Sequence, residues 1–155
     1  MPDLKLVALD AEDLGVISAH LQDAVVRLGD MTFLPGEKRF AAVANRFDWA
    51  RALAGGKQKQ ASKDLERRRT GIRFERVLSA QVHGLNLQDK SAALALLAVT
   101  FMPHDANEPV DGDVTLTFSG GAAIRLKVEC LEVEMKDLGA AWSAKRAPEH
   151  PETKS

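Results

Sequence analysis

The sequence predicts a single α+β domain built mainly from an antiparallel sheet. Its 155 residues fit one domain. Apolar residues alternate with a period of two over most of the chain, which is the spacing of strands with one buried face. Helical spacing is clear in one segment near the start. We therefore expect a curved sheet or partly open barrel of about seven strands, with one helix after the first strand and a short C-terminal helix.

The composition places the chain among ordinary globular proteins and excludes a strong global charge. With 45% hydrophobic and 28% charged residues, it has enough apolar material for a core. A formal charge of −1 provides no chain-wide attraction for nucleic acid or anionic lipid. Cys130 is the single cysteine, which excludes an internal disulfide and suits a reducing compartment. We expect a cytoplasmic protein that does not enter a membrane.

The first segment reads as a strand followed by the helix. Residues 4–9 are mostly apolar and short, and Asp10 is a residue type that caps a helix by accepting a hydrogen bond from a backbone N–H. Residues 11–22 then place Leu14, Ile17 and Leu21 on one stripe, the pattern of a helix that packs on a sheet.

The next segment predicts a hairpin. Residues 25–34 and 39–47 are rich in Val, Phe and Ala, and the Pro-Gly-containing turn 35–38 separates them. The alternation places Phe40, Ala42 and Ala44 on one face of the second strand.

Residues 54–69 lose this periodicity in a run of Gly, Lys, Gln and Ser, which predicts a mobile basic loop inside one domain spanning residues 1–147. The final segment, 148–155, holds two prolines and few apolar residues, so we expect a disordered tail.

The second half of the chain predicts further strands. Residues 72–83 alternate up to Gly84, with an interruption at Arg76 and Val77 that suggests a bulge. Residues 92–102 are apolar on both faces and read as a central strand, with a buried helix as the alternative. Residues 114–118 and 124–130 form the clearest hairpin.

After Cys130 the apolar alternation shifts by one residue, which a bulge or a bend would explain. A short terminal helix through Trp142 is then expected. The complete topology is similar to the pleckstrin-homology-like architecture, and that analogy carries no function.

A basic segment over residues 57–73 is the first candidate binding site. Its cationic side chains can neutralise phosphates. The alternative is a solvated loop that keeps an edge strand soluble, since binding stripes usually also offer aromatic rings. The residues that we select as the basic patch are Lys63, Arg67, Arg68, Arg69 and Arg73.

The second candidate lies at the end of a predicted strand, where two aromatic rings, an Arg and an Asn occur within five residues. These residue types often anchor binding patches. The alternative is a structural corner in which Trp49 packs on the sheet edge and Arg46 pairs with Asp48. The residues that we select here are Asn45, Arg46, Phe47 and Trp49.

Other polar clusters predict no catalytic residue, no metal and no cofactor. The acidic run Glu129, Glu132, Glu134 and Asp137 reads as a solvated or intersubunit face, and its charge opposite to the basic segment permits head-to-tail association. The four histidines lack metal-ligand spacing, and no nucleophile or phosphate-binding motif occurs. Among them, His104 followed by Asp105 is the single pairing of note.

Several spaced segments resemble one family. They are residues 22–25 (Gln-Asp-Ala-Val), residues 45–49 (Asn-Arg-Phe-Asp-Trp), residues 94–98 (Leu-Ala-Leu-Leu-Ala) and residues 121–138, which end Glu-Val-Glu-Met-Lys-Asp-Leu. Together they resemble an alphaproteobacterial family catalogued as domain of unknown function 2948, over residues 4–142. The resemblance implies a bacterial cytosolic protein and assigns no activity or site residue.

Three functional hypotheses follow. The first is a non-enzymatic module that binds an unidentified protein or itself through a sheet edge or the 45–49 corner. The second is an RNA- or phosphate-binding accessory protein that uses residues 57–73. The third is an enzyme whose site is assembled from distant residues such as His83, His104 and Glu132.

Overall fold

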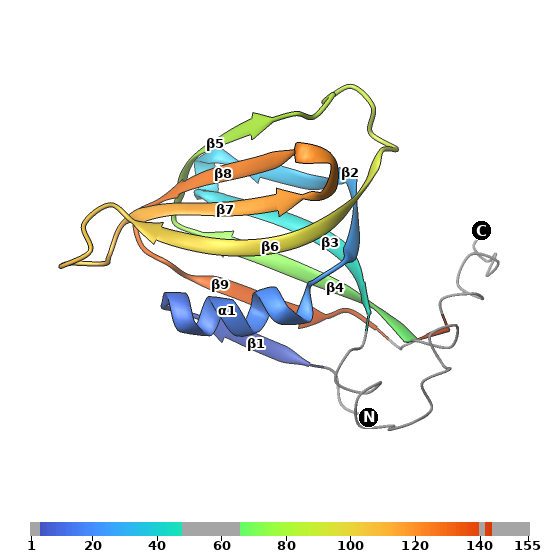
Figure 1. The fold of residues 1–155 in the computed structure, drawn as a ribbon, viewed down its shortest axis with the longest axis horizontal. Coiled ribbons are helices and arrows are strands. Elements are labelled where there is room, and N and C mark those ends of the chain that lie inside the picture. Colours follow the sequence, from blue (N-terminus) through green and yellow to red (C-terminus); the bar gives the residue numbers. More distant parts are fainter. Residues whose placement is uncertain (1–3, 48–65, 140–141, 144–155) are drawn as a thin grey trace.

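The computed structural model describes residues 4–47, 66–139 and 142–143 (Figure 1). One α-helix, ten strands and two 3₁₀ turns make up this part of the chain. In chain order they are β1 (Lys5–Ala8), α1 (Ala11–His20), β2 (Ala24–Leu34), η1 (Pro35–Glu37), β3 (Arg39–Phe47), β4 (Glu66–Glu75), β5 (Val77–His83), β6 (Ala93–Pro103), β7 (Gly112–Phe118), η3 (Ser119–Gly121), β8 (Ala123–Val128), β9 (Val133–Asp137) and β10 (Trp142–Ser143).

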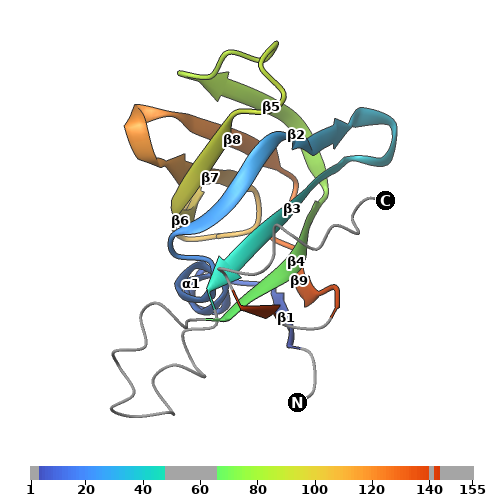
Figure 2. The same cartoon turned by 90° about the vertical axis from the view of Figure 1, so that its right-hand side faces the viewer.

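All strand pairs are antiparallel and belong to one open, strongly curved sheet (Figures 1 and 2). Its order is β1-β9-β4-β3-β2-β6-β7-β8-β5, and β10 pairs with β4 beside this path. The antiparallel α+β class is thus confirmed. The expected number of about seven strands is wrong, and the pleckstrin-homology-like topology is not confirmed.

The strand count rises because the predicted bulge at Arg76 and Val77 and the predicted bulge or bend after Cys130 are both sharp corners. Arg76 adopts a left-handed φ of 62° and separates β4 from β5. The break at residues 129–132 likewise separates β8 from β9. The two corners lie together, because the Glu129 N–H donates to the Arg76 carbonyl and the Glu75 N–H to the Glu132 carbonyl, both at 2.9 Å. The chain therefore changes its neighbouring strands at each corner: β4 pairs with β3 and β9, whereas β5 pairs with β8.

Helix α1 begins where the sequence predicts, because Asp10 accepts a hydrogen bond from the Asp13 N–H at 2.8 Å. It packs against β1 and β6 and buries Leu14 and Ile17. The Ser18 hydroxyl also accepts from the Val99 N–H of β6 at 2.9 Å, which fixes the helix across the sheet. In the part of the chain described, no helix has the length and apolarity needed to cross a membrane.

The core fills the concave side of the sheet. Phe40 and Phe74 face each other across the β3–β4 pair, with ring centroids 6.1 Å apart. The predicted inner face of β3 is confirmed, since Phe40, Ala42 and Ala44 are all buried. Both predicted hairpins are present, as β2–β3 and β7–β8, and the segment that begins near Ala93 is a strand between β2 and β7.

The C-terminal prediction is wrong at Trp142, which lies in β10 and not in a helix. Strand β9 pairs with β4 over residues 70–74, which leaves the start of that β4 edge available to a further strand. Trp142 and Ser143 pair with Arg67 and Glu66 there, because backbone pairing at an open sheet edge competes with a local helical turn.

The limits of the predicted basic loop also change. Residues 66–69 belong to β4, so this part of the predicted loop is a strand. Residues 54–65 and the predicted disordered tail, 148–155, lie outside the described residues.

Candidate functional site

The β3–β4 register brings the two binding segments predicted from sequence side by side. Residues 45, 46 and 47 of β3 lie opposite residues 69, 68 and 67 of β4. Because side chains alternate between the faces of a strand, the odd-numbered residues point outward and the even-numbered ones inward. Each of the two predicted segments therefore contributes to two clusters, one outer and one inner, with different surroundings. Trp49 and Lys63 lie outside the described residues.

The outer cluster consists of Asn45, Phe47, Arg67 and Arg69, which we call the β3–β4 patch. The Arg67 guanidinium carbon lies 4.4 Å from the centre of the Phe47 ring, a cation–π contact. Burial lowers the pKa of Arg67 from its ordinary value. Arg69 is exposed, so the patch combines a covered cation with an open one.

Two buried polar atoms in this patch have no hydrogen-bond partner: Asn45 Oδ1 and Arg67 Nε. An unpaired buried polar atom costs about 1–3 kcal/mol, so native structures keep few of them. One acceptor and one donor are thus present together on the outer face. A ligand with complementary groups reaches these buried atoms only when the groups that cover them move.

The inner cluster surrounds Asp137, whose side chain is 1% exposed. Arg46 donates from Nε and Nη2 to its two oxygens at 3.1 and 2.9 Å. The Thr70 hydroxyl and the Leu4 N–H add bonds at 2.8 and 3.0 Å, and Arg68 Nε lies 4.0 Å away. Burial raises the pKa of Asp137, but the bonds from Arg46, Leu4 and Thr70 outweigh it and lower the pKa overall. Arg46 and Arg68 are therefore structural in this arrangement.

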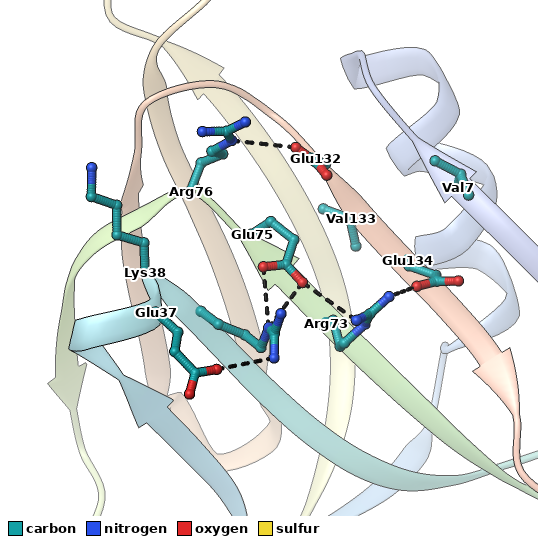
Figure 3. Close-up of a pocket in the computed structure, with 10 residues that line it drawn as sticks. Val7, Glu37, Lys38, Arg73, Glu75, Arg76, Glu132, Val133 and Glu134 are labelled. Carbon is teal, nitrogen blue, oxygen red and sulfur yellow. Dashed lines mark hydrogen bonds and ion pairs between the residues drawn. The ribbon is translucent and has the colours of Figure 1, made fainter.

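Farther along the outer face, a groove of about 540 Å³ lies where β3, β4 and β9 meet (Figure 3). Glu75 is at its centre and accepts from Arg39 Nε at 3.1 and 3.0 Å. Arg73 Nη1 approaches Glu75 to 3.7 Å from the other side, and Glu37 pairs with Arg39 Nη1 at 3.2 Å. The cations of this groove thus already have acidic partners.

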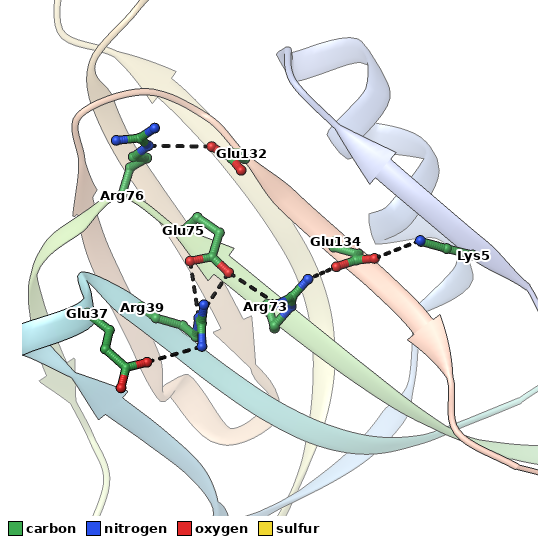
Figure 4. A network of polar contacts seen from close by, with 8 residues as sticks. All are labelled: Lys5, Glu37, Arg39, Arg73, Glu75, Arg76, Glu132 and Glu134. Atoms are coloured by element: carbon green, nitrogen blue, oxygen red, sulfur yellow. Dashed lines mark hydrogen bonds and ion pairs between the residues drawn. The ribbon is translucent and has the colours of Figure 1, made fainter.

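The same network extends to β9 and β1 (Figure 4). Arg73 Nη2 is hydrogen-bonded to Glu134, and Lys5 of β1 pairs with Glu134 at 3.3 Å. Beside the corner, Arg76 pairs with Glu132 at 3.5 Å. The acidic run was predicted as a solvated or intersubunit face, which is wrong for Asp137 because this residue is buried. The other three carboxylates of the run pair with Lys38, Arg76 and Arg73 of the same chain, so head-to-tail association is not needed to neutralise them.

A second, smaller groove of about 260 Å³ contains His104. The Nδ1 atom of His104 lies 3.2 Å from Asp111 and the Nε2 atom lies 3.3 Å from Asp113. These two contacts raise the pKa of His104, and the contact with Asp111 has the larger effect. The partner predicted from sequence was Asp105, which instead accepts from the Asn107 N–H. The pairing of β6 with β7 was the available signal, because it brings together the ends of the connecting loop, where the His104 N–H donates to the Asp111 carbonyl at 2.9 Å.

The residues of the enzyme hypothesis do not converge. His83 pairs with Ala123 at one end of β8, whereas the His104 groove lies at the other end. Glu132 pairs with Arg76 at the corner. Among the described residues, no three His, Cys, Asp or Glu side chains are placed to hold a metal ion.

These observations define a small antiparallel α+β protein whose outer sheet face carries an arginine–aromatic patch beside a neutralised ion-pair network. The chain belongs to the family described as "Protein of unknown function (DUF2948)", whose model matches residues 4–150. The predicted family is confirmed, and its alphaproteobacterial origin stays a prediction. No curated protein matches the chain significantly, and no solved structure does.

Proposed function

We propose that this protein is a non-enzymatic protein-interaction module of the bacterial cytoplasm, with the β3–β4 patch as its contact surface. The observation that carries the proposal is the pair of unsatisfied buried atoms, Asn45 Oδ1 and Arg67 Nε, beside the exposed Arg69. Arg and aromatic side chains are also enriched at the energetic centres of protein interfaces.

The chemistry of the patch suits a partner segment with both a carboxylate and a backbone or amide donor. A carboxylate accepts from the guanidinium groups of Arg67 and Arg69, which project from the same face of β4. An N–H donor satisfies Asn45 Oδ1. An acidic, extended protein segment offers both kinds of group.

Nucleic acid is the less favoured ligand for this surface. The Phe47 ring already has the Arg67 guanidinium over one face, so that face is not open to a stacking base. Arg73 is engaged with Glu134 and Glu75, and Arg68 is buried. The described part of the basic segment therefore offers fewer open cations than its sequence suggests.

Site-specific photocrosslinking in bacterial cells tests the proposal. A photoreactive amino acid replaces Val43, which lies on the outer face of β3 beside the patch and is not part of it, and a control carries it at Arg27, an exposed Arg of β2. We expect a protein adduct from position 43 that disappears when Asn45→Ala and Arg67→Ala are added, and no matching adduct from position 27. An adduct that nuclease removes would favour the nucleic-acid hypothesis, and equal adducts from both positions would refute the proposal.

A further inference from the structure

The two ends of the sheet differ in how well they are protected against pairing with another strand. An unpaired edge strand presents free N–H and C=O groups, and natural proteins guard such edges by shortness, charge, bulges or covering elements. Strand β1, at one end, has four residues, begins with Lys5 and packs against α1. This end is guarded in three ways.

Strand β5, at the other end, has far less protection. Its seven residues, Val-Leu-Ser-Ala-Gln-Val-His, contain no Asp, Glu, Lys, Arg or Pro. The Val77 N–H donates to the Lys38 carbonyl at 2.9 Å, and beyond Val77 no described residue pairs with the outer side of β5. Figures 1 and 2 both show β5 at the rim of the sheet, with no strand beyond it.

A shift in the β5–β8 register limits the part of this edge that can pair regularly with another strand. The β5–β8 register shifts between Val77 and Ser79, so Leu78 is an extra residue and the regular ladder runs over Ser79–His83. We call this segment the β5 edge. Ala80 and Val82 lie opposite the buried Leu126 and Ile124 and continue the core face, and Val82 is 37% exposed.

We infer that the β5 edge pairs with the β5 edge of a second copy of this chain, antiparallel about a two-fold axis at Gln81. This register places Ala80 opposite Val82 of the second copy on the core side, and Gln81 opposite its equivalent on the outer side. Apolar groups thus meet apolar groups and polar groups meet polar ones, and no Asp, Glu, Lys or Arg of β5 opposes another. The sheet continues from one protomer into the other.

Self-pairing suits this edge better than a foreign strand because the edge carries no charge with which to select one. Specificity between different chains usually uses complementary charges and repulsion of wrong partners. Closed two-fold dimers are also the commonest oligomers, and a formal charge of −1 leaves little repulsion between copies. The edge is short, so we expect an association of micromolar order, below that of a standard interface of about 1,600 Å².

This inference is independent of the β3–β4 patch and is tested by charge at the axis. Gln81→Lys and Gln81→Glu each place like charges opposite each other in a homodimer, whereas an equimolar mixture of the two variants places opposite charges there. The Glu variant also keeps an acceptor for Arg125, which donates to Gln81 Oε1 at 2.9 Å in the native chain. Thr100→Lys and Thr100→Glu, at an exposed position of β6, are the matched controls.

Sedimentation velocity over a range of concentrations measures the effect, with circular dichroism to verify folding. We expect wild type and both Thr100 variants to dimerise reversibly, each Gln81 variant to associate at least about tenfold more weakly, and the mixture to recover wild-type affinity. A wild-type chain that stays monomeric, Gln81 variants that dimerise as well as wild type, or a mixture no stronger than its components would overturn the inference.

Discussion

The inner and outer clusters of the β3–β4 pair arise from the same short stretches of chain, yet they differ in hydrogen bonding. The buried carboxylate of the inner cluster has several partners, whereas two polar atoms of the outer cluster have none. Inside, Asp137 is bonded by Arg46, Thr70 and the Leu4 N–H. Outside, Asn45 Oδ1 and Arg67 Nε lack partners. A buried carboxylate without any partner would cost far more than one unpaired Asn oxygen and one unpaired Arg N–H, which agrees with the full bonding of Asp137. The unsatisfied groups therefore lie on the outer face of the pair and not around the buried carboxylate.

The largest effect is expected from breaking the inner cluster. Asp137→Ala leaves the Arg46 guanidinium buried without its carboxylate partner, and removal of one partner from a buried pair typically costs about 3–5 kcal/mol. Urea denaturation should show that loss in the free energy of unfolding. Glu132→Ala, at a pair whose carboxylate is 45% exposed, is the control and should change stability by under about 1 kcal/mol. Equal losses in both variants would contradict the distinction.

The contribution of the inner cluster to the free energy of unfolding should fall in acid. The pKa of Asp137 is lower in the folded state than in the unfolded chain, so the unfolded state binds the proton more readily. The stabilisation from Asp137 is therefore present above the unfolded value of about 3.9 and is lost as pH falls through the folded pKa. Chemical denaturation between about pH 2 and 6 should show a steeper fall in wild type than in Asp137→Asn. Parallel pH profiles would show that Asp137 titrates normally.

A smaller change in stability is expected on the outer face. Arg67→Ala removes the cation–π contact with Phe47, worth about 0.5–2 kcal/mol at this half-buried position, but it also removes the unpaired Nε, whose burial costs about 1–3 kcal/mol. The two effects oppose each other, so the unfolding free energy should change by less than about 1 kcal/mol. Loss of the position-43 photoadduct in Arg67→Ala without unfolding would separate binding from stability. A loss as large as that of Asp137→Ala would make Arg67 structural.

The smallest effect is expected at His104, where two carboxylates surround a cation in solvent, the inverse of the Asp137 arrangement. Asp111 and Asp113 raise the pKa of His104, so the stabilisation is complete below the unfolded pKa and is lost as pH rises through the folded one. An NMR titration of the His104 ring should show this raised pKa, and Asp111→Asn should move it towards the ordinary value of about 6.5. An unchanged titration in Asp111→Asn would exclude this cause.

The sequence interpretation succeeded where the determining interactions are local. The cap at Asp10, the turn at Pro35 and the alternation over residues 39–47 each depend on neighbours within a few positions, and all are present in the structure. It failed at Arg76, because a corner and a bulge produce the same local change of phase, and they differ in which distant strand pairs next. The terminal strand β10 was not predicted for a related reason. The residues near Trp142 give no information about the edge of β4 with which this strand pairs.

The candidate site shows the same division. Asn45, Phe47, Arg67 and Arg69 were all selected from their residue types alone, but as members of two separate segments. Their meeting depends on the β3–β4 register, and no periodicity on either strand specifies which residues pair across the connecting segment 48–65.

By itself, the sequence determined the antiparallel α+β class, the helix, the hairpins and the residue types available for binding, because periodicity and turn chemistry act over a few residues. The tertiary structure alone decided which arginine is buried and which faces solvent. Arg46 and Asp137 are 91 positions apart, and their pairing follows from the placement of β9 beside β4. Such contacts depend on the burial of the complete sheet, in which a one-residue change of register would exchange the inner and outer faces.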